Sequence, residues 1–124
     1  MNITFEEYLV LKKTMQETQK VRILSNSMEP FIHTDEEIVI KKFESKLIRK
    51  FTPIVFWYNE RLICHFYIKK INKDNCSYYL TKSLNSKYYD ELIKEEHVLG
   101  EVIIPKVSIF KKLLMAIAHY KTFF

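Results

Sequence analysis

Residues 54–71 read IVFWYNERLICHFYIKKI and carry the strongest secondary-structure signal in the chain. Two runs of β-branched and aromatic residues, 54–58 and 61–71, flank the pair Asn59-Glu60, and this pattern predicts a β-hairpin. Similar short runs, separated by polar turns, recur at residues 21–24, 37–43, 76–82 and 98–104. We therefore expect a mainly β protein with about six strands, mostly antiparallel. A short helix is expected within residues 86–96.

Helical patterns flank this β-rich stretch at both ends of the chain. Thr4 and Glu7 form a capping-box pattern, and apolar residues then recur at helical spacing to near Thr18. After Pro105, residues 106–120 predict a second helix, with lysines away from an apolar stripe of Val107, Phe110, Leu113, Leu114 and Ile117. Two interpretations of this helix stay open. It packs on the domain, or it is a basic amphipathic helix that contacts a membrane surface or a partner.

The composition sets the size of the protein and excludes several kinds of site. The 124 residues fit one domain spanning 1–124, and 48% of them are hydrophobic, enough for a sizeable core. Gly100 is the single glycine, where average usage predicts about nine. A P-loop and a GxGxxG turn are therefore excluded. Turns with a positive φ must use Asn, Asp, Ser or Lys, and Gly100 itself is expected at a bulge or a close backbone approach.

The basic charge is mild and comes mostly from lysine. Twenty Lys and Arg residues against fifteen Asp and Glu give a net charge of +5, and only Arg22, Arg49 and Arg61 are arginine. Base readers and phosphate clamps favour the planar fork of arginine, so no specific nucleic-acid partner is expected. A basic nucleic-acid-binding protein is kept as a third alternative. The sequence has no metal-ligand spacing, and neither a metal nor a cofactor is expected.

The two cysteines, Cys64 and Cys76, are expected to be free thiols in a reducing compartment. A turn over residues 72–75 would pair Ile71 with Cys76 and Cys64 with Ser83, which keeps the two sulfurs apart. No apolar run approaches the roughly 20 residues of a membrane span, and the N-terminal segment is charged where a signal peptide would be apolar. We therefore expect a cytoplasmic protein, with peripheral membrane contact through the C-terminal helix as the alternative.

The polar segment Ser25-Asn26-Ser27-Met28-Glu29-Pro30 resembles the S-x-S-M-x-P box of the signal peptidase I and LexA-type serine peptidase superfamily. Five later segments resemble further boxes of that family, in the same order and with similar gaps. These are residues 36–40 and 52–56 (two G-D-x-V strands), 63–66 (I-x-H-R), 80–86 (L-T-K-G-D-x-N) and 98–102 (V-x-G-x-V). Together with the strand pattern, the resemblance implies a coiled, antiparallel, partly barrel-like sheet with a helix at each end.

The sequence departs from the family pattern within several of these boxes. The glycines of both G-D boxes are missing, and so is the Gly-Asp pair after Thr81-Lys82. Phe66 stands where the family has arginine after its histidine. The charged N-terminal helix takes the place of the family's membrane anchor, which leads us to expect a substrate other than a membrane-inserted secretory signal peptide.

Members of this superfamily activate their serine either with a lysine or with a histidine and an aspartate. The base position here holds His65, so the closest resemblance is to the ER, archaeal and SipW-type signal peptidases. It implies a triad of Ser27, His65 and Asp90, with Glu91 and Asp74 as the nearest rivals to Asp90. Ser27 would be the nucleophile, His65 the general base, and Asp90 the acceptor for the other ring nitrogen.

The resemblance also implies how substrate would be bound. The backbone N–H of Ser27 and the hydroxyl of Ser25 would donate to the oxyanion, and Met28 is assigned to substrate binding. Family members hold a peptide as an extended strand, so the expected partner is a peptide or protein substrate. Because strand neighbours alternate faces, Cys64 is expected to point away from His65, which disfavours a Cys-His enzyme.

The leading hypothesis is a soluble serine endopeptidase that forms an acyl-enzyme on Ser27. It would cleave an extended leader, propeptide or signal-like segment. The alternative is a catalytically inactive module that keeps the fold and binds peptides, and the missing Gly-Asp boxes motivate it. The two differ in one requirement, because only the enzyme needs Ser27 and His65 within hydrogen-bond reach in a groove.

Overall fold

The computed structural model describes residues 2–23, 28, 32, 35–44, 48–84, 86–106 and 109–120. Seven strands form one antiparallel sheet in the order β1-β2-β7-β3-β4-β5-β6. In chain order the elements are α1 (Phe5–Thr14), β1 (Thr18–Ile23), β2 (Glu36–Lys42), β3 (Pro53–Tyr58), β4 (Arg61–Lys73), β5 (Cys76–Lys82), β6 (Ile93–Lys94), the 3₁₀ helix η1 (Glu95–His97), β7 (Val98–Ile104) and α2 (Ile109–Tyr120). The expected mainly β fold with a helix at each end is confirmed.

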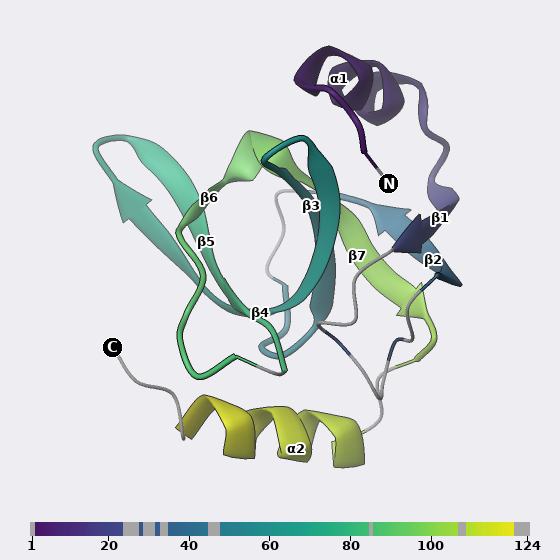
Figure 1. Cartoon of the computed structure of the whole chain (residues 1–124). Helices are drawn as coiled ribbons and strands as arrows, with labels where there is room; N and C mark the ends of the chain where they lie inside the picture. The colour runs from purple at the N-terminus through teal and green to yellow at the C-terminus, as the bar shows by residue number, and fades with distance from the viewer. Residues whose placement is uncertain are drawn as a thin grey trace.

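The sheet is strongly coiled, and α1 and α2 lie at opposite ends of it (Figure 1). β1 and β6 are the two edges of the strand order, so the described strands form an open, partly barrel-like sheet that is not closed into a barrel. Coiling of this kind follows from the right-handed twist that every strand carries.

The N-terminal helix begins at the expected capping box. The Thr4 hydroxyl accepts a hydrogen bond from the Glu7 backbone N–H at 3.2 Å, and the Glu7 carboxylate accepts one from the Thr4 N–H at 3.1 Å. The helix ends at Thr14, earlier than expected, because β1 already begins at Thr18. Buried Tyr8 fixes the helix to the domain by donating its hydroxyl to the carbonyl of Glu96 at 2.9 Å.

The hairpin of β3 and β4 turns at Asn59-Glu60, as expected. Both turn residues have positive φ, 51° and 62°. This is the backbone that a two-residue hairpin turn requires, because it matches the twist of the flanking strands. Asn59 fits the prediction that Asn, Asp, Ser or Lys takes the place of glycine where φ is positive. That prediction is wrong for Glu60 in the same turn and for Phe51, whose φ is 68°.

The register expected for the next hairpin is wrong. β4 and β5 are joined by the two-residue turn Asp74-Asn75, with φ of 51° and 62°, so Lys73 pairs with Cys76 and Ile71 with Tyr78. The sequence pattern predicts a four-residue turn over residues 72–75 instead. The shorter turn forms because Asp and Asn both tolerate a left-handed backbone. A register irregularity between Tyr67 and Lys69 shifts the remaining pairs, so Phe66 pairs with Lys82, where the expected register would pair it with Thr81.

Gly100 lies where two neighbouring strands approach closely. A Cβ atom at this position would lie 2.3 Å from the carbonyl oxygen of Lys41. The pairing of β7 with β3 is also irregular here, between Val55 and Phe56. The expectation of a bulge or a close backbone approach at Gly100 is therefore confirmed.

The prediction of a short helix within residues 86–96 is wrong for most of that segment. The segment instead contains β6, which pairs Ile93 with Tyr79 and Lys94 with Tyr78, followed by η1. Ile93 is buried in a core cluster with Tyr79. Pairing with the edge of β5 therefore buries the apolar side chain that an amphipathic helix would otherwise have buried.

The C-terminal helix is present, but its apolar stripe does not cover the core. Met115 is buried, whereas Leu113 and Ile117, two members of the expected stripe, are exposed. The interpretation in which the apolar stripe packs on the domain is therefore wrong for Leu113 and Ile117.

Candidate functional site

The alternation of β4 separates His65 from Cys64. Cys64 and Phe66 lie in the larger core cluster, whereas Tyr67 lies in the smaller cluster on the other face and Ile63 packs against it. His65, between Ile63 and Tyr67 in this alternation, pairs with Ile54 of β3. The expectation that Cys64 points away from His65 is confirmed. Burial raises the pKa of the Cys64 thiol to about 12, so it is not a reactive thiolate.

His65 and Asp90 are brought together by the fold. Nδ1 of His65 lies 2.5 Å from Oδ2 of Asp90, a short hydrogen bond between residues 25 positions apart. The His65 ring also packs edge-on against Phe56, with ring centroids 5.7 Å apart. The two side chains are only 13% and 23% exposed, so the pair is largely shielded from water while part of it stays accessible.

Thr81 holds Asp90 from both the backbone and the side chain. The Asp90 backbone N–H donates to the Thr81 carbonyl at 3.0 Å, and the Thr81 hydroxyl donates to Oδ2 of Asp90 at 2.7 Å. Thr81 is itself fully buried near the end of β5. The carboxylate that bonds His65 is therefore fixed by a rigid strand and not only by its own loop.

This arrangement determines which nitrogen of His65 is available for chemistry. A carboxylate only accepts hydrogen bonds, so Nδ1 must carry the proton in the bond to Asp90. Nε2 of a neutral imidazole is then the acceptor, able to take a proton from a nucleophile. An imidazolium formed in this way would be stabilised by the Asp90 carboxylate.

A pocket of about 240 Å³ opens beside the His65–Asp90 pair. Its walls combine apolar and charged side chains, and they are Phe56, Tyr58, Arg61, Ile63, His65, Asp90, Glu91 and Ile93. The Tyr58 hydroxyl donates to the Glu91 carboxylate at 3.1 Å and joins the β3–β4 turn to the segment that carries Asp90. A substrate group that enters this pocket would lie against the imidazole.

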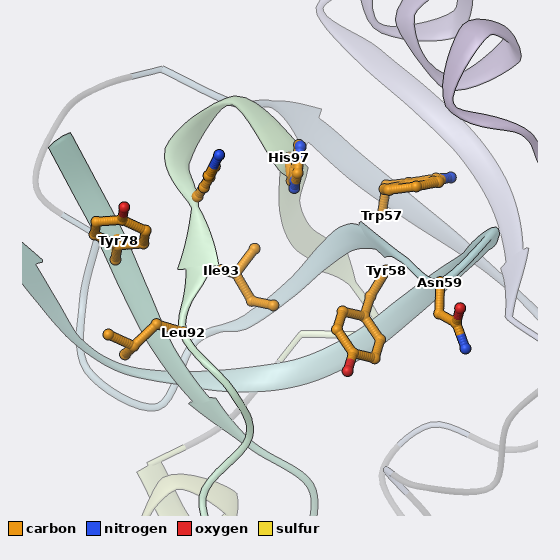
Figure 2. Close-up of a pocket in the computed structure, with 8 residues that line it drawn as sticks. Trp57, Tyr58, Asn59, Tyr78, Leu92, Ile93 and His97 are labelled. Atoms are coloured by element: carbon orange, nitrogen blue, oxygen red, sulfur yellow. The ribbon is translucent and has the colours of Figure 1, made fainter.

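A second pocket of about 440 Å³ adjoins the first and shares Tyr58 and Ile93 with it. Its other walls are Trp57, Asn59, Tyr78, Leu92, Lys94 and His97. Figure 2 shows Ile93 between two groups of side chains, with Tyr78 and Leu92 on one side and Tyr58, Asn59 and Trp57 on the other. The two pockets therefore lie side by side, and the larger one is lined mainly by aromatic and aliphatic side chains.

Lys82 has a structural environment that the sequence did not reveal. Its side chain is buried, and Nζ donates to the carbonyls of Ser83 at 3.1 Å and Ser86 at 2.5 Å. Desolvation lowers the pKa of this ammonium group, partly offset by the charge of Asp90. Because both carbonyls belong to the segment between β5 and Asp90, Lys82 ties down the chain on which Asp90 is presented.

The peptidase S24-like family matches residues 1–103, which include β4, Thr81 and Asp90. The chain belongs to the peptidase S24-like family. This match supports the resemblance to the LexA and signal-peptidase-type superfamily. A search among curated proteins found no match.

Within this S24-like domain, the expected site residues have different placements. His65 and Asp90 are hydrogen-bonded, whereas Ser25 and Ser27 lie outside the described residues. Met28 is buried in the larger core cluster with Ile23 and Ile32. The side chain is 2% exposed, so it has little surface with which to contact a substrate, the role expected from the sequence.

The two rival acids of the S24-like domain are engaged elsewhere. Glu91 bonds Tyr58, and Asp74 occupies the exposed turn between β4 and β5. Of the three acids weighed from the sequence, Asp90 is therefore the one that the structure places on the His65 ring. Among the residues that the structure describes, no three His, Cys, Asp or Glu side chains gather as a metal site.

Two residues of this site were not expected from the sequence, Thr81 as the second donor to Asp90 and Lys82 as the clamp of the following segment. The only sequence signal for both residues is their place in the L-T-K segment of residues 80–82, which resembles a family box. None of the helices in the described part of the chain has the length and apolar character of a membrane span.

Proposed function

We propose that this S24-like protein is a serine endopeptidase whose nucleophile is Ser27, whose general base is His65 and whose orienting acid is Asp90. The observation that supports the proposal is the hydrogen bond between His65 Nδ1 and Asp90 Oδ2, together with the Thr81 bond to the same oxygen. A histidine that must become an imidazolium during reaction is stabilised directly by such a carboxylate.

The proposed reaction follows from these roles. Oγ of Ser27 attacks the carbonyl carbon of the scissile peptide while its proton passes to Nε2 of His65. The backbone N–H of Ser27 and the Ser25 hydroxyl donate to the resulting oxyanion. The C–N bond then breaks, the imidazolium gives its proton to the leaving amine, and an ester on Ser27 remains. Water, activated by the same imidazole, hydrolyses that ester and restores Ser27.

The proposed substrate is an extended segment of a leader, propeptide or signal-like sequence. The adjoining pockets support this choice because they share Tyr58 and Ile93 and so offer two recesses side by side. An extended chain presents alternate side chains to one surface, so two neighbouring recesses suit it. We propose a cytoplasmic location, where Cys64 and Cys76, both free thiols in the structure, would stay reduced.

The alternative proposal is an inactive peptide-binding module. The observation that favours it is the loss of the Gly-Asp boxes, since Glu36 begins β2 and Thr52-Pro53 leads into β3 without a preceding glycine. Both functions use the same pockets. They differ only in whether bound peptide is cleaved and whether Ser27 reacts.

A serine-directed fluorophosphonate probe and a peptide library test the proposal on the full chain. Wild-type protein should be labelled and should cleave peptide, while Ser27→Ala and His65→Ala should lose activity by about a thousandfold or more. Ser77→Ala is the matched control, since Ser77 lies on β5 and bonds only Asn72 among the interactions described. Equal labelling of Ser27→Ala and wild type would refute the nucleophile. Peptide binding without cleavage or labelling would favour the inactive module.

A further inference from the structure

The C-terminal helix α2 presents apolar side chains to solvent in a continuous stripe. Leu113, Ile117 and Tyr120 follow the i, i+4, i+7 spacing of one helix face and are 57%, 45% and 84% exposed. Leu114 lies beside them and is also exposed. We call these four residues the α2 stripe. Solvated helices normally place polar side chains on the outer face, so this orientation is unusual.

The opposite side of the helix attaches α2 to the domain. Met115 is fully buried in the larger core cluster, and Nδ1 of His119 lies 2.9 Å from the Tyr89 hydroxyl. The His119 ring also packs against Phe51, with centroids 6.0 Å apart. Because Met115 and His119 are four residues apart, they share the face that looks inward. The α2 stripe is therefore held outward by the packing and is not a consequence of a loosely attached helix.

The surroundings of the α2 stripe are basic. Residues 102–124 contain four lysines, at positions 106, 111, 112 and 121, and no Asp or Glu. Two exposed lysines from other parts of the chain, Lys50 and Lys69, also act on the charge of His119, so they lie near this helix. The α2 stripe is therefore part of a basic end of the molecule.

We propose that the α2 stripe is a docking surface for an anionic lipid bilayer. Apolar side chains on a basic helix enter the boundary between headgroups and acyl chains, while nearby lysines attract the anionic headgroups. A second copy of this chain is a poor occupant, because it would bring two basic surfaces together. The helix also lies outside residues 1–103, the part of the chain that matches the S24-like family.

Docking in this way would bring the candidate site close to the membrane. His119 bonds Tyr89, the residue immediately before Asp90, so α2 contacts the segment that carries the acid of the pair. A peptide segment lying at or leaving the membrane surface would then be within reach of the pockets. The docking itself does not depend on catalysis, and Ser27→Ala protein is expected to bind vesicles as wild type does.

Co-sedimentation with lipid vesicles tests the inference. We expect the full chain to bind vesicles of phosphatidylcholine mixed with phosphatidylserine, to bind pure phosphatidylcholine poorly, and to be released by high salt. The double variant Leu113→Glu/Ile117→Glu should bind these anionic vesicles at least about tenfold more weakly than wild type. Both positions are exposed, so its melting temperature should stay near that of wild type, and this is measured in parallel.

The matched control is Val10→Glu. Val10 is 62% exposed on α1, at the other end of the sheet, so this variant introduces a negative charge at an exposed apolar position away from α2. It should bind the anionic vesicles as wild type does. Equal binding of the double variant and wild type, or no binding of wild type to anionic vesicles, would overturn the proposal. So would light scattering that shows a dimer that the double variant abolishes.

Discussion

Nδ1 of His65 and Oδ2 of Asp90 lie 2.5 Å apart, and the same carboxylate oxygen accepts the Thr81 hydroxyl at 2.7 Å. The imidazole is therefore oriented by an acid that is itself held by a buried strand residue. In a working triad this order of contacts fixes the tautomer in which Nε2 is free to accept a proton.

Replacing Asp90 with Asn should keep the fold and remove most of the proposed activity. The amide can still occupy the position, but it can donate to Nδ1 and so favour the wrong tautomer. We expect kcat to fall by about a thousandfold to ten-thousandfold. The measurement is steady-state cleavage of the best library peptide. Glu91→Gln changes the neighbouring acid, which bonds Tyr58, and should have a much smaller effect. Similar losses in both variants would contradict the assignment of Asp90.

Thr81→Val tests whether the second hydrogen bond positions Asp90. Valine keeps the shape and β-branching of the buried side chain but cannot donate to the carboxylate. We expect kcat to fall by about tenfold with little change in KM, and Thr81→Ser to restore most of the rate. A purely structural role would instead lower the melting temperature of Thr81→Val without a selective change in kcat.

Lys82→Met should destabilise the segment that leads to Asp90. Methionine retains much of the apolar stem, but the carbonyls of Ser83 and Ser86 lose their shared donor. The expected cost is about 1–3 kcal/mol in the free energy of unfolding, measured by urea denaturation. Lys87→Met, in the same segment but exposed, should change stability little. An unchanged free energy of unfolding for Lys82→Met would show that the clamp is not needed.

Gly100→Ala should destabilise the sheet more than a substitution at a neighbouring exposed residue. The new Cβ would lie 2.3 Å from the Lys41 carbonyl, so β2 and β7 must move apart locally. We expect a loss of about 1–3 kcal/mol, read from chemical denaturation. Ile103→Ala, also on β7 but exposed, serves as the comparison. Equal melting temperatures for Gly100→Ala and wild type would contradict this steric explanation.

Stability should fall as the pH drops below about 6.5, in part because of His97. Burial, as the largest cause, lowers the pKa of His97, whose ring packs against Phe5 and Trp57. The unfolded chain then binds more protons than the folded one between the two pKa values, so the stability present at neutral pH is lost as pH decreases through that window. His97→Gln should reduce this dependence in urea denaturation across the same range. An identical pH dependence in the variant would exclude His97 as a source.

Local sequence signals predicted most of the fold. The alternating apolar runs gave the β3–β4 hairpin, and the Thr4–Glu7 capping box gave the start of α1, because both depend on interactions between residues close in sequence. The register of β4 with β5 was not predicted correctly. The register depends on whether the turn contains two residues or four. The two-residue turn forms because Asp74 and Asn75 both adopt a left-handed backbone conformation.

The sequence determined that the chain is a β-rich S24-like domain, and its order of boxes singled out Ser27, His65 and Asp90 as candidates. It could not decide whether Asp90 or Glu91 bonds the imidazole, because the fold of the segment determines which of two adjacent side chains points toward His65. Nor could it orient α2, because an apolar stripe has the same periodicity whether it faces the core or solvent. Both were decided by tertiary packing, through the Thr81 contact that fixes Asp90 and the Met115 and His119 contacts that turn the α2 stripe outward.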